Sequence, residues 1–365
     1  MNSTSYRCIP IRGGYATVLF LLPLIACQSG QTRFEDSPVI DRLLDSAPHF
    51  VVNTDIEPKR WVATTRLGLP SDSLILGRPS QMIAVGDSVY ISEDFGHNIF
   101  SVGADGYLNR KIGQQGQGPG EFTTVSGLQY SGSHIFVQEI ERIQVFSETF
   151  EYVNSFFSMD YLLNRFSVSP DYMFLQCPGD PRENDWIVCA RSTSTPYNWI
   201  SSIKLLPRLD LRNQTGENSN VLTVSPGGDR IAMAYRGFPY IFVYDHQFRH
   251  LRTIRFEGKQ VRDFQPSGFP AGVPTGAEAF TRAFIGTIKF INSHYLIARS
   301  PRTDHYVFDL SEENYRLVKK IVFRPITDSE ESKDIPAADF LLHKDHLYVS
   351  SPWEEYVYGY EFNLE

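Results

Sequence analysis

The chain has 365 residues, with 42 acidic against 34 basic side chains and a formal net charge of −8 at pH 7. That balance argues against nucleic acid, and against an anionic membrane surface, as a general partner. Aromatic residues make up 13% of the chain, which favours strands over helices.

The N-terminal segment predicts a secretory signal. Arg7 and Arg12 precede an apolar stretch, Tyr15 to Ala26, in a region without charge. This stretch is too short to span a hydrocarbon core, which needs about 20 apolar residues, but it has the size of a signal-peptide core. We therefore expect residues 1–26 to be a signal peptide, and no later apolar run is long enough for a membrane span.

The signal ends in Leu24-Ile25-Ala26-Cys27, which resembles the lipobox of bacterial lipoproteins. The resemblance implies lipidation of Cys27 and a protein anchored to a bacterial membrane in the cell envelope, facing the periplasm or the exterior. The mature chain would then carry a net charge of about −10. An ordinary signal peptide or a membrane anchor, with a chance cysteine, is the alternative.

Residues 27–57 are expected to be a tether with one short helix. Ser37 and Pro38 are a good helix start, because serine caps the first turn and proline suits the first helical position.

Beyond Trp61 a unit of four short strands separated by turns recurs. Five units are complete and the sixth has three strands. The units run over residues 82–112, 127–157, 166–205, 221–256, 285–323 and 340–362.

The strand missing from the sixth unit is available at the other end of the repeats. An unassigned strand at Trp61–Leu67 precedes the first unit and would fill the outer edge of the last. Closing the ring in this way removes an open edge. The sequence therefore predicts an all-β fold, a six-bladed β-propeller over residues 58–365. A β-sandwich or two stacked β domains would not explain a six-fold unit with one displaced strand.

A glycine-rich run, Lys111 to Phe122, lies between the first two units and contains Gly118-Pro119-Gly120-Glu121-Phe122. It resembles the blade junction of NHL-repeat propellers, and more closely that of the six-bladed TolB-like propeller lipoproteins of Bacteroidetes and their relatives. Asp94 and Asn98 also resemble part of an NHL repeat. The later units lack the run, so the resemblance implies the fold over 61–365 and no activity.

The run also has a physical interpretation, a tight connection in which Glu121 turns back to bind loop amides. A phosphate-binding loop is disfavoured, because no Lys-Ser or Lys-Thr follows and no helix pattern begins.

Cys177 and Cys189 flank a turn-rich segment at the facing ends of two strands. In an oxidising compartment they could form a disulfide across a hairpin, and two separate buried thiols are the alternative. No second pair of cysteines or histidines lies near them, which disfavours a zinc site.

Loops between second and third strands share one face of a propeller with the connections between blades. Five arginines and one glutamate, from five of the six units, are expected near the channel mouth on this face: Arg78, Glu121, Arg165, Arg236, Arg282 and Arg299. Planar guanidinium groups bind carboxylate, sulfate or phosphate. Alternatively, each arginine pairs with a neighbouring carboxylate and only fixes the blades.

The connection from Arg262 to Arg282 is the other candidate element. A connection of this length is often functional and could lie as a flap across the same face. A surface loop packed by its own aromatic residues is the alternative.

These features favour a monomeric, non-catalytic binding module that needs no cofactor. Its partner would be an envelope protein or a small carbohydrate or peptide ligand. The alternative is a divalent-metal hydrolase similar to calcium-dependent propeller lactonases, with Glu121, Asn220 and Asp339 as oxygen ligands. Arginines at neighbouring positions would repel such a cation, and no Ser-His-Asp set or histidine cluster stands out.

Overall fold

In the computed structural model, residues 37–365 form one compact unit. The structure describes residues 37–364 apart from 72–73, 158–165, 177–185, 194–202, 210–218, 265–282, 301–302, 312–314 and 327–332. Within these residues no helix combines the length and apolarity needed to cross a membrane.

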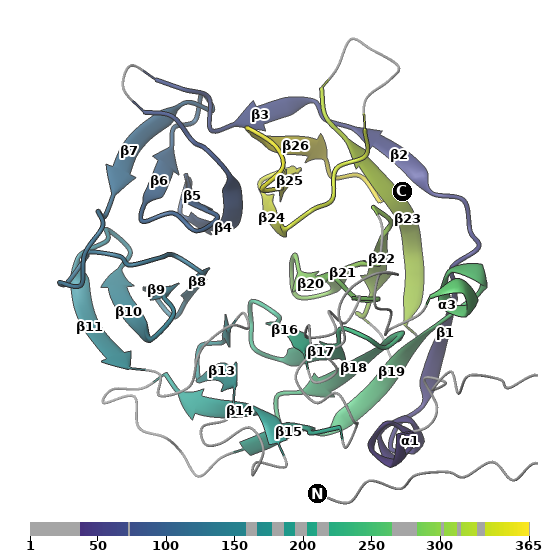
Figure 1. Ribbon diagram of the computed structural model, residues 1–365. Coiled ribbons are helices and arrows are strands. Elements are labelled where there is room, and N and C mark those ends of the chain that lie inside the picture. The colour runs from purple at the N-terminus through teal and green to yellow at the C-terminus, as the bar shows by residue number, and fades with distance from the viewer. Residues whose placement is uncertain are drawn as a thin grey trace, which may run out of the picture. The chain divides into compact units, whose positions relative to one another are not determined.

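Six sheets arranged in a ring confirm the six-bladed β-propeller (Figure 1). The four strands of each blade form an antiparallel meander with the first strand nearest the centre. Blade one contains β4 (Pro79–Val85), β5 (Ser88–Glu93), β6 (Ile99–Val102) and β7 (Leu108–Ile112). Blade two contains β8 (Gly127–Ser131), β9 (His134–Gln138), β10 (Arg142–Ser147) and β11 (Tyr152–Phe157). Blade three contains β12 (Ser167–Val168), β13 (Tyr172–Gln176), β14 (Trp186–Ser192) and β15 (Ile203–Pro207).

The remaining three blades complete the ring and carry the N-terminal strands on their outer edges. Blade four contains β16 (Asn220–Val224), β17 (Arg230–Tyr235), β18 (Tyr240–Asp245) and β19 (His250–Glu257). Blade five contains β20 (Thr287–Phe290), β21 (Tyr295–Arg299), β22 (His305–Asp309) and β23 (Arg316–Arg324). Blade six contains β24 (Asp339–His343), β25 (His346–Ser350), β26 (Val357–Glu361) and β3 (Thr65–Leu67).

The N-terminal closure is confirmed, but the closing strand is shorter than the predicted Trp61–Leu67. Only β3 pairs with β26 and completes blade six. Trp61 and Val62 belong to β2 (Lys59–Val62), which runs parallel to β23 on the outside of blade five. The chain changes blades between two residues: the Ala63 amide donates to Arg324 O and the Thr64 amide donates to Gly359 O.

Part of the predicted tether also lies on the propeller. Helix α1 spans Pro38–Asp45 and buries Val39, Ile40 and Leu44. It is followed by β1 (His49–Asn53), which pairs in parallel with β19 on the outside of blade four. Strand β1 buries Val52 in the core between blades four and five. The segment from residue 49 to 67 is therefore a belt that visits blades four, five and six in turn (Figure 1).

Side-chain oxygens link the innermost strands of neighbouring blades, which belong to different sheets. Ser167 Oγ accepts from the Val224 amide at 3.1 Å, and Thr223 Oγ1 accepts from the Phe290 amide at 3.2 Å. Asp339, only 1% exposed, accepts from the Met82 amide at 2.9 Å and pairs with Lys289 Nζ at 2.8 Å. These contacts satisfy amides that would otherwise be buried without a partner, and they fix the spacing of the blades around the axis.

Candidate functional site

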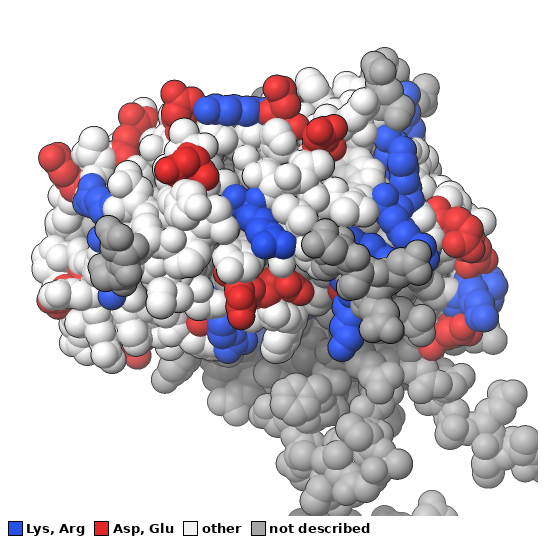
Figure 2. All heavy atoms as spheres, turned by 90° about the horizontal axis from the view of Figure 1, so that it is seen from above, with Lys and Arg blue, Asp and Glu red and all other residues white. Residues whose placement is uncertain are grey.

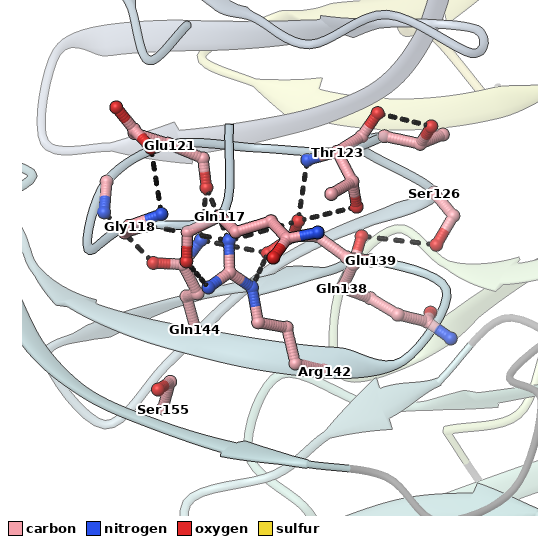
Figure 3. A network of polar contacts seen from close by, with 12 residues as sticks. Gln117, Gly118, Glu121, Thr123, Ser126, Gln138, Glu139, Arg142, Gln144 and Ser155 are labelled. Atoms are coloured by element: carbon pink, nitrogen blue, oxygen red, sulfur yellow. Dashed lines mark hydrogen bonds and ion pairs between the residues drawn. The ribbon is translucent and has the colours of Figure 1, made fainter. Parts of the chain in front are cut away.

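The glycine-rich run is a tight junction between blades one and two (Figure 3). Glu121 Oε2 accepts from the Gly118 amide at 2.8 Å, and its Oε1 accepts from Gln114 Nε2 at 2.9 Å. These two hydrogen bonds, the Gly118 amide first, hold the pKa of Glu121 below its ordinary value. The predicted return of Glu121 to the loop amides is confirmed, and its carboxylate is engaged within its own loop.

A buried ion pair supports this junction from below (Figure 3). Glu139 is 1% exposed and accepts from the Thr123 amide at 2.7 Å, from Gln144 Nε2 at 2.8 Å and from Arg142. Arg142 also donates to Glu121 O at 2.8 Å. The network therefore ties the junction to the strands of blade two and leaves no cradle of free amides for a phosphate.

The predicted arginines have different surroundings. Arg78 forms an ion pair with Asp94 at 3.0 Å and lies over the Trp353 ring at 5.7 Å. These contacts agree with the alternative in which an arginine pairs with a neighbouring carboxylate and only fixes the blades. Arg236 donates to Asn220 O at 3.4 Å. Arg299 lines a large cleft. Arg165 and Arg282 lie outside the described residues.

The cysteine predictions fall partly outside the described residues. Cys189 is disulfide-bonded, whereas Cys177 and the lipidation residue Cys27 are not described. The pairing of Cys177 with Cys189 stays a prediction.

The three oxygen ligands of the hydrolase alternative have local partners in different parts of the ring. Glu121 is held in the junction of blades one and two. Asp339 lies beside the Lys289 ammonium, whose charge opposes a cation there. Asn220 is buried at the start of β16, and its carbonyl accepts from Arg236. The geometry gives no support to a calcium site built from these residues.

A cleft of about 1070 Å³ lies at the interface of blades four and five. It lies on the predicted ligand face, because its inner wall contains the end of β21 and the connections that precede β20 and β24. Its other walls are the chain between β1 and β2, and a short helix after β19, α3 (Lys259–Asp263). The described lining residues are Thr54, Asp55, Ile56, Glu57, Pro58, Lys259, Gln260, Arg262, Asp263, Phe264, Ala283, Gly286, Arg299, Ser300, Lys320 and Pro336.

Arg299 and Gly286 form the inner end of the cleft. Arg299 donates to Ala337 O at 2.7 Å, and the Gly286 amide donates to Arg299 O at 2.9 Å. A Cβ atom at position 286 would lie 2.5 Å from the Arg299 guanidinium. The guanidinium can therefore occupy this position only because residue 286 is glycine.

His305 lies directly across from Arg299 in the register of β21 and β22. Burial, aided by the Arg299 charge, lowers the pKa of His305 to about 3. His305 is therefore neutral at physiological pH and adds no second charge beside the guanidinium.

Gln260 anchors α3 to blade five. Its side-chain oxygen accepts from Ser300 Oγ at 3.3 Å and from Tyr306 Oη at 3.2 Å, and its nitrogen donates to Asp304. Burial, with the Asp304 carboxylate nearby, raises the pKa of Tyr306. Tyr306 therefore stays protonated and able to donate to Gln260.

A buried lysine and a glycine fix the outer end of the cleft. Lys320 Nζ, 5% exposed in its side chain, pairs with Asp304 at 3.0 Å and donates to Thr54 O at 2.8 Å. The Lys259 amide donates to Asp55 Oδ1 at 2.7 Å. Gly258 has a φ of +118°, and a Cβ atom there would lie 2.4 Å from Thr54 Oγ1. The corner at Thr54 and Asp55 is therefore held against α3 and β23.

The outer rim at the top of Figure 1 differs from the cleft in its charge distribution. Figure 2 shows acidic and basic side chains interspersed along it, with neither sign dominant. The described residues of this rim therefore form no extended field of one sign that would select a charged partner.

Comparison with known proteins assigns the chain to no family and to no function. No family model matches the chain, and no curated protein matches its sequence. Three solved structures are similar: a provisionally named exported protein from Bacteroides fragilis, the β-propeller domain of Cps50 (Swd1) from Myceliophteria thermophila, and the WD40 repeats of RRP9. The first has 12% identity and a TM-score of 0.46, over 83% of this chain and 88% of the other. The Cps50 domain has 9% identity and a TM-score of 0.45, over 80% of this chain and 100% of that domain. The RRP9 repeats have 10% identity and a TM-score of 0.45, over 76% of this chain and 77% of the other.

Proposed function

We propose that this protein is a binding propeller of the bacterial cell envelope, a TolB-like lipoprotein anchored through Cys27. Its cleft between blades four and five binds a ligand that carries a carboxylate, sulfate or phosphate group. The observation that carries the proposal is Arg299, whose guanidinium lies at the inner end of a cleft of about 1070 Å³ over a glycine that leaves room for it.

The surroundings of Arg299 favour an anion over a cation. Its neighbour across the strand register, His305, is neutral and adds no charge of its own. The hydrogen bond from Arg299 Nη1 to Ala337 O holds the guanidinium in place before any ligand arrives. A guanidinium held in this way loses little conformational freedom when it binds a planar anion.

A titration with small anions tests this proposal. Sodium acetate, phosphate and sulfate, each compared with sodium chloride at equal ionic strength, should raise the melting temperature of the full-length protein in a saturable way. Arg299→Gln should abolish the saturable part, and Gly286→Ala should weaken it, because the added methyl group displaces the guanidinium. Arg249→Gln, which removes an arginine at the turn after β18, is the matched control and should bind as the wild type does. Equal anion responses in the wild type and Arg299→Gln would refute the proposal.

The lipid anchor has its own test. Bacterial cells that express the full chain and grow with radiolabelled palmitate should yield labelled protein. The Cys27→Ser variant should carry no label. Cys8→Ser is the control, because Cys8 precedes the apolar stretch of the signal. Label that persists in Cys27→Ser would contradict anchoring at this residue.

A further inference from the structure

Apolar side chains are exposed at the tips of three neighbouring loops. The loops join the second and third strands of blades six, one and two, which lie next to one another in the ring (Figure 1). Trp353 is 72% exposed, Phe95 76% and Ile140 43%, and we call these three residues the apolar tips. In blade four the corresponding loop instead buries Phe238. The apolar tips are therefore a local feature of one side of the ring, away from the cleft between blades four and five.

Phe95 has a backbone conformation that normally favours glycine. It stands in the third position of the turn at residues 93–96, and its φ is +57°. Such a conformation is unfavourable for a bulky side chain. Phe150 and Phe248 also have positive φ, but each of them packs against other aromatic rings. The Phe95 ring contacts no other described ring, so ring packing within the described chain does not offset its strain.

Arg78 holds the tips of blades six and one in place. Its guanidinium pairs with Asp94 at 3.0 Å, donates to Pro352 O at 3.2 Å and lies over the Trp353 ring at 5.7 Å. The Asp94 amide in turn donates to Arg78 O at 2.8 Å. One side chain therefore connects the two loops that carry the exposed aromatic rings.

The chain between Thr123 and Val125 connects the tips of blades one and two. The Val125 amide donates to Gly96 O at 2.8 Å, and the Thr123 amide donates to Glu139 Oε2 at 2.7 Å, next to Ile140. The three loops are thus held by hydrogen bonds before any partner binds. Groups held in place in this way lose little conformational freedom on binding.

Carboxylates lie beside the apolar tips and are only partly neutralised. Glu141 and Glu355 are exposed and form no ion pair with any described residue. Glu354 accepts from Tyr358 Oη at 3.3 Å and has no cationic partner in the described part of the chain. Arg78, by contrast, is already paired with a carboxylate. A partner that complements this surface therefore has basic side chains among apolar ones.

We infer that the apolar tips bind a basic, apolar segment of a partner protein. Exposed Trp353 and Phe95 are its anchors, because aromatic side chains are enriched at protein interfaces and Trp is enriched among the residues that dominate binding. The Trp353 ring can also stack with a basic group of the partner, as it does with Arg78. A neutral sugar would leave Glu141 and Glu355 without a counter-charge. This surface lies outside the cleft, so the inference does not rest on the proposed function.

Calorimetric titration of the full-length protein with the peptide acetyl-Lys-Leu-Lys-Leu-Lys-Leu-amide tests the inference. Trp353→Ala should weaken binding about thirtyfold, the loss expected for a central aromatic anchor. Phe95→Gly should weaken it about tenfold. The same variant should melt at a temperature no lower than the wild type, because glycine tolerates a positive φ. The peptide with Glu in place of each Lys should show no binding.

Three control variants separate the apolar tips from the rest of the surface. Tyr107→Ala removes an aromatic side chain, 47% exposed, from the turn between β6 and β7 at the opposite end of blade one. Glu151→Gln removes an exposed carboxylate elsewhere in blade two, and Arg299→Gln changes the cleft. All three should bind the peptide as the wild type does, whereas Glu355→Gln should weaken binding about twofold.

Each contrary outcome has a clear meaning. Absence of peptide binding, equal affinity for the acidic peptide, or an affinity unchanged in Trp353→Ala and Phe95→Gly would overturn the inference. Binding of maltohexaose that depends on Trp353, without binding of the basic peptide, would assign the surface to a carbohydrate instead. A clearly lower melting temperature in Phe95→Gly would show that this ring supports the fold, and would remove it as an anchor.

Discussion

Arg142→Ala is expected to lower the free energy of unfolding by about 3–5 kcal/mol, which is the range for removal of one partner of a buried ion pair. Glu139 would remain 1% exposed without its cation. The change would also remove the bond to Glu121 O that fixes the glycine-rich junction. Urea denaturation at pH 7, with the slope against urea checked for constancy, measures the loss.

Two comparisons make this prediction specific. Arg249→Ala breaks an ion pair to Asp245 in which the arginine side chain is 70% exposed, and it should cost less than about 1 kcal/mol. The double variant Glu139→Gln with Arg142→Met leaves no unpaired charge, so it should be milder than Arg142→Ala alone. A loss for Arg142→Ala no larger than that for Arg249→Ala would show that the network does not support the junction.

Acid should destabilise the fold through His305, by about 3 kcal/mol between pH 7 and pH 4. The side chain is fully buried and packs against Phe323 and Phe340 at ring distances of 4.8 and 5.5 Å. Its pKa is about 3 in the folded protein, against about 6.5 when unfolded. The unfolded chain therefore binds an extra proton as the pH falls below about 6.5, and folding weakens by about 1.4 kcal/mol per pH unit until about pH 3.

His305→Leu removes this titration. The difference in free energy of unfolding between pH 7 and pH 4 should be about 3 kcal/mol smaller in this variant than in the wild type. His294→Leu, at an exposed histidine of the same blade, should leave the difference unchanged. If His305→Leu shows the same acid dependence as the wild type, His305 is charged or exposed in the folded protein.

The fold was predictable because the blades repeat. Each blade needs apolar strands with polar turns between them, and that pattern is local in sequence. The position of β3 at the end of blade six followed from counting strands. The division of Trp61–Leu67 between blades five and six could not be predicted from the sequence. Only tertiary hydrogen bonds to Arg324 and Gly359 reveal where the chain changes blades.

The face on which the cleft lies was singled out from topology, whereas the cleft itself was not predicted. Arg299 was identified from its place at the end of a second strand. The different surroundings of Arg78, Arg236 and Arg299 depend on which partners each side chain finds, and those partners include residues from other segments. The outer wall at residues 54–58 was expected to be a tether, because parallel addition of β1 and β2 to distant strands leaves no periodic signal of its own.

One signal in the sequence does point to the cleft. Gly258 and Gly286 stand just after β19 and just before β20, on either side of the long connection. Gly258 leaves space that the Thr54 side chain occupies, and Gly286 leaves space that the Arg299 side chain occupies. The glycines at the two ends of this long connection therefore mark places where the backbone closely approaches a side chain. Composition alone does not distinguish such glycines from glycines in turns.

The central claim is that Arg299 forms an anion site in the cleft between blades four and five. Diffraction from crystals of the full-length protein grown with sodium selenate, measured at the selenium edge, tests it most directly. The predicted result is an anomalous peak within hydrogen-bond distance of the Arg299 guanidinium in the wild type, and no peak there in Arg299→Gln. Selenium peaks confined to other arginines, with the cleft empty in the wild type, would contradict the claim.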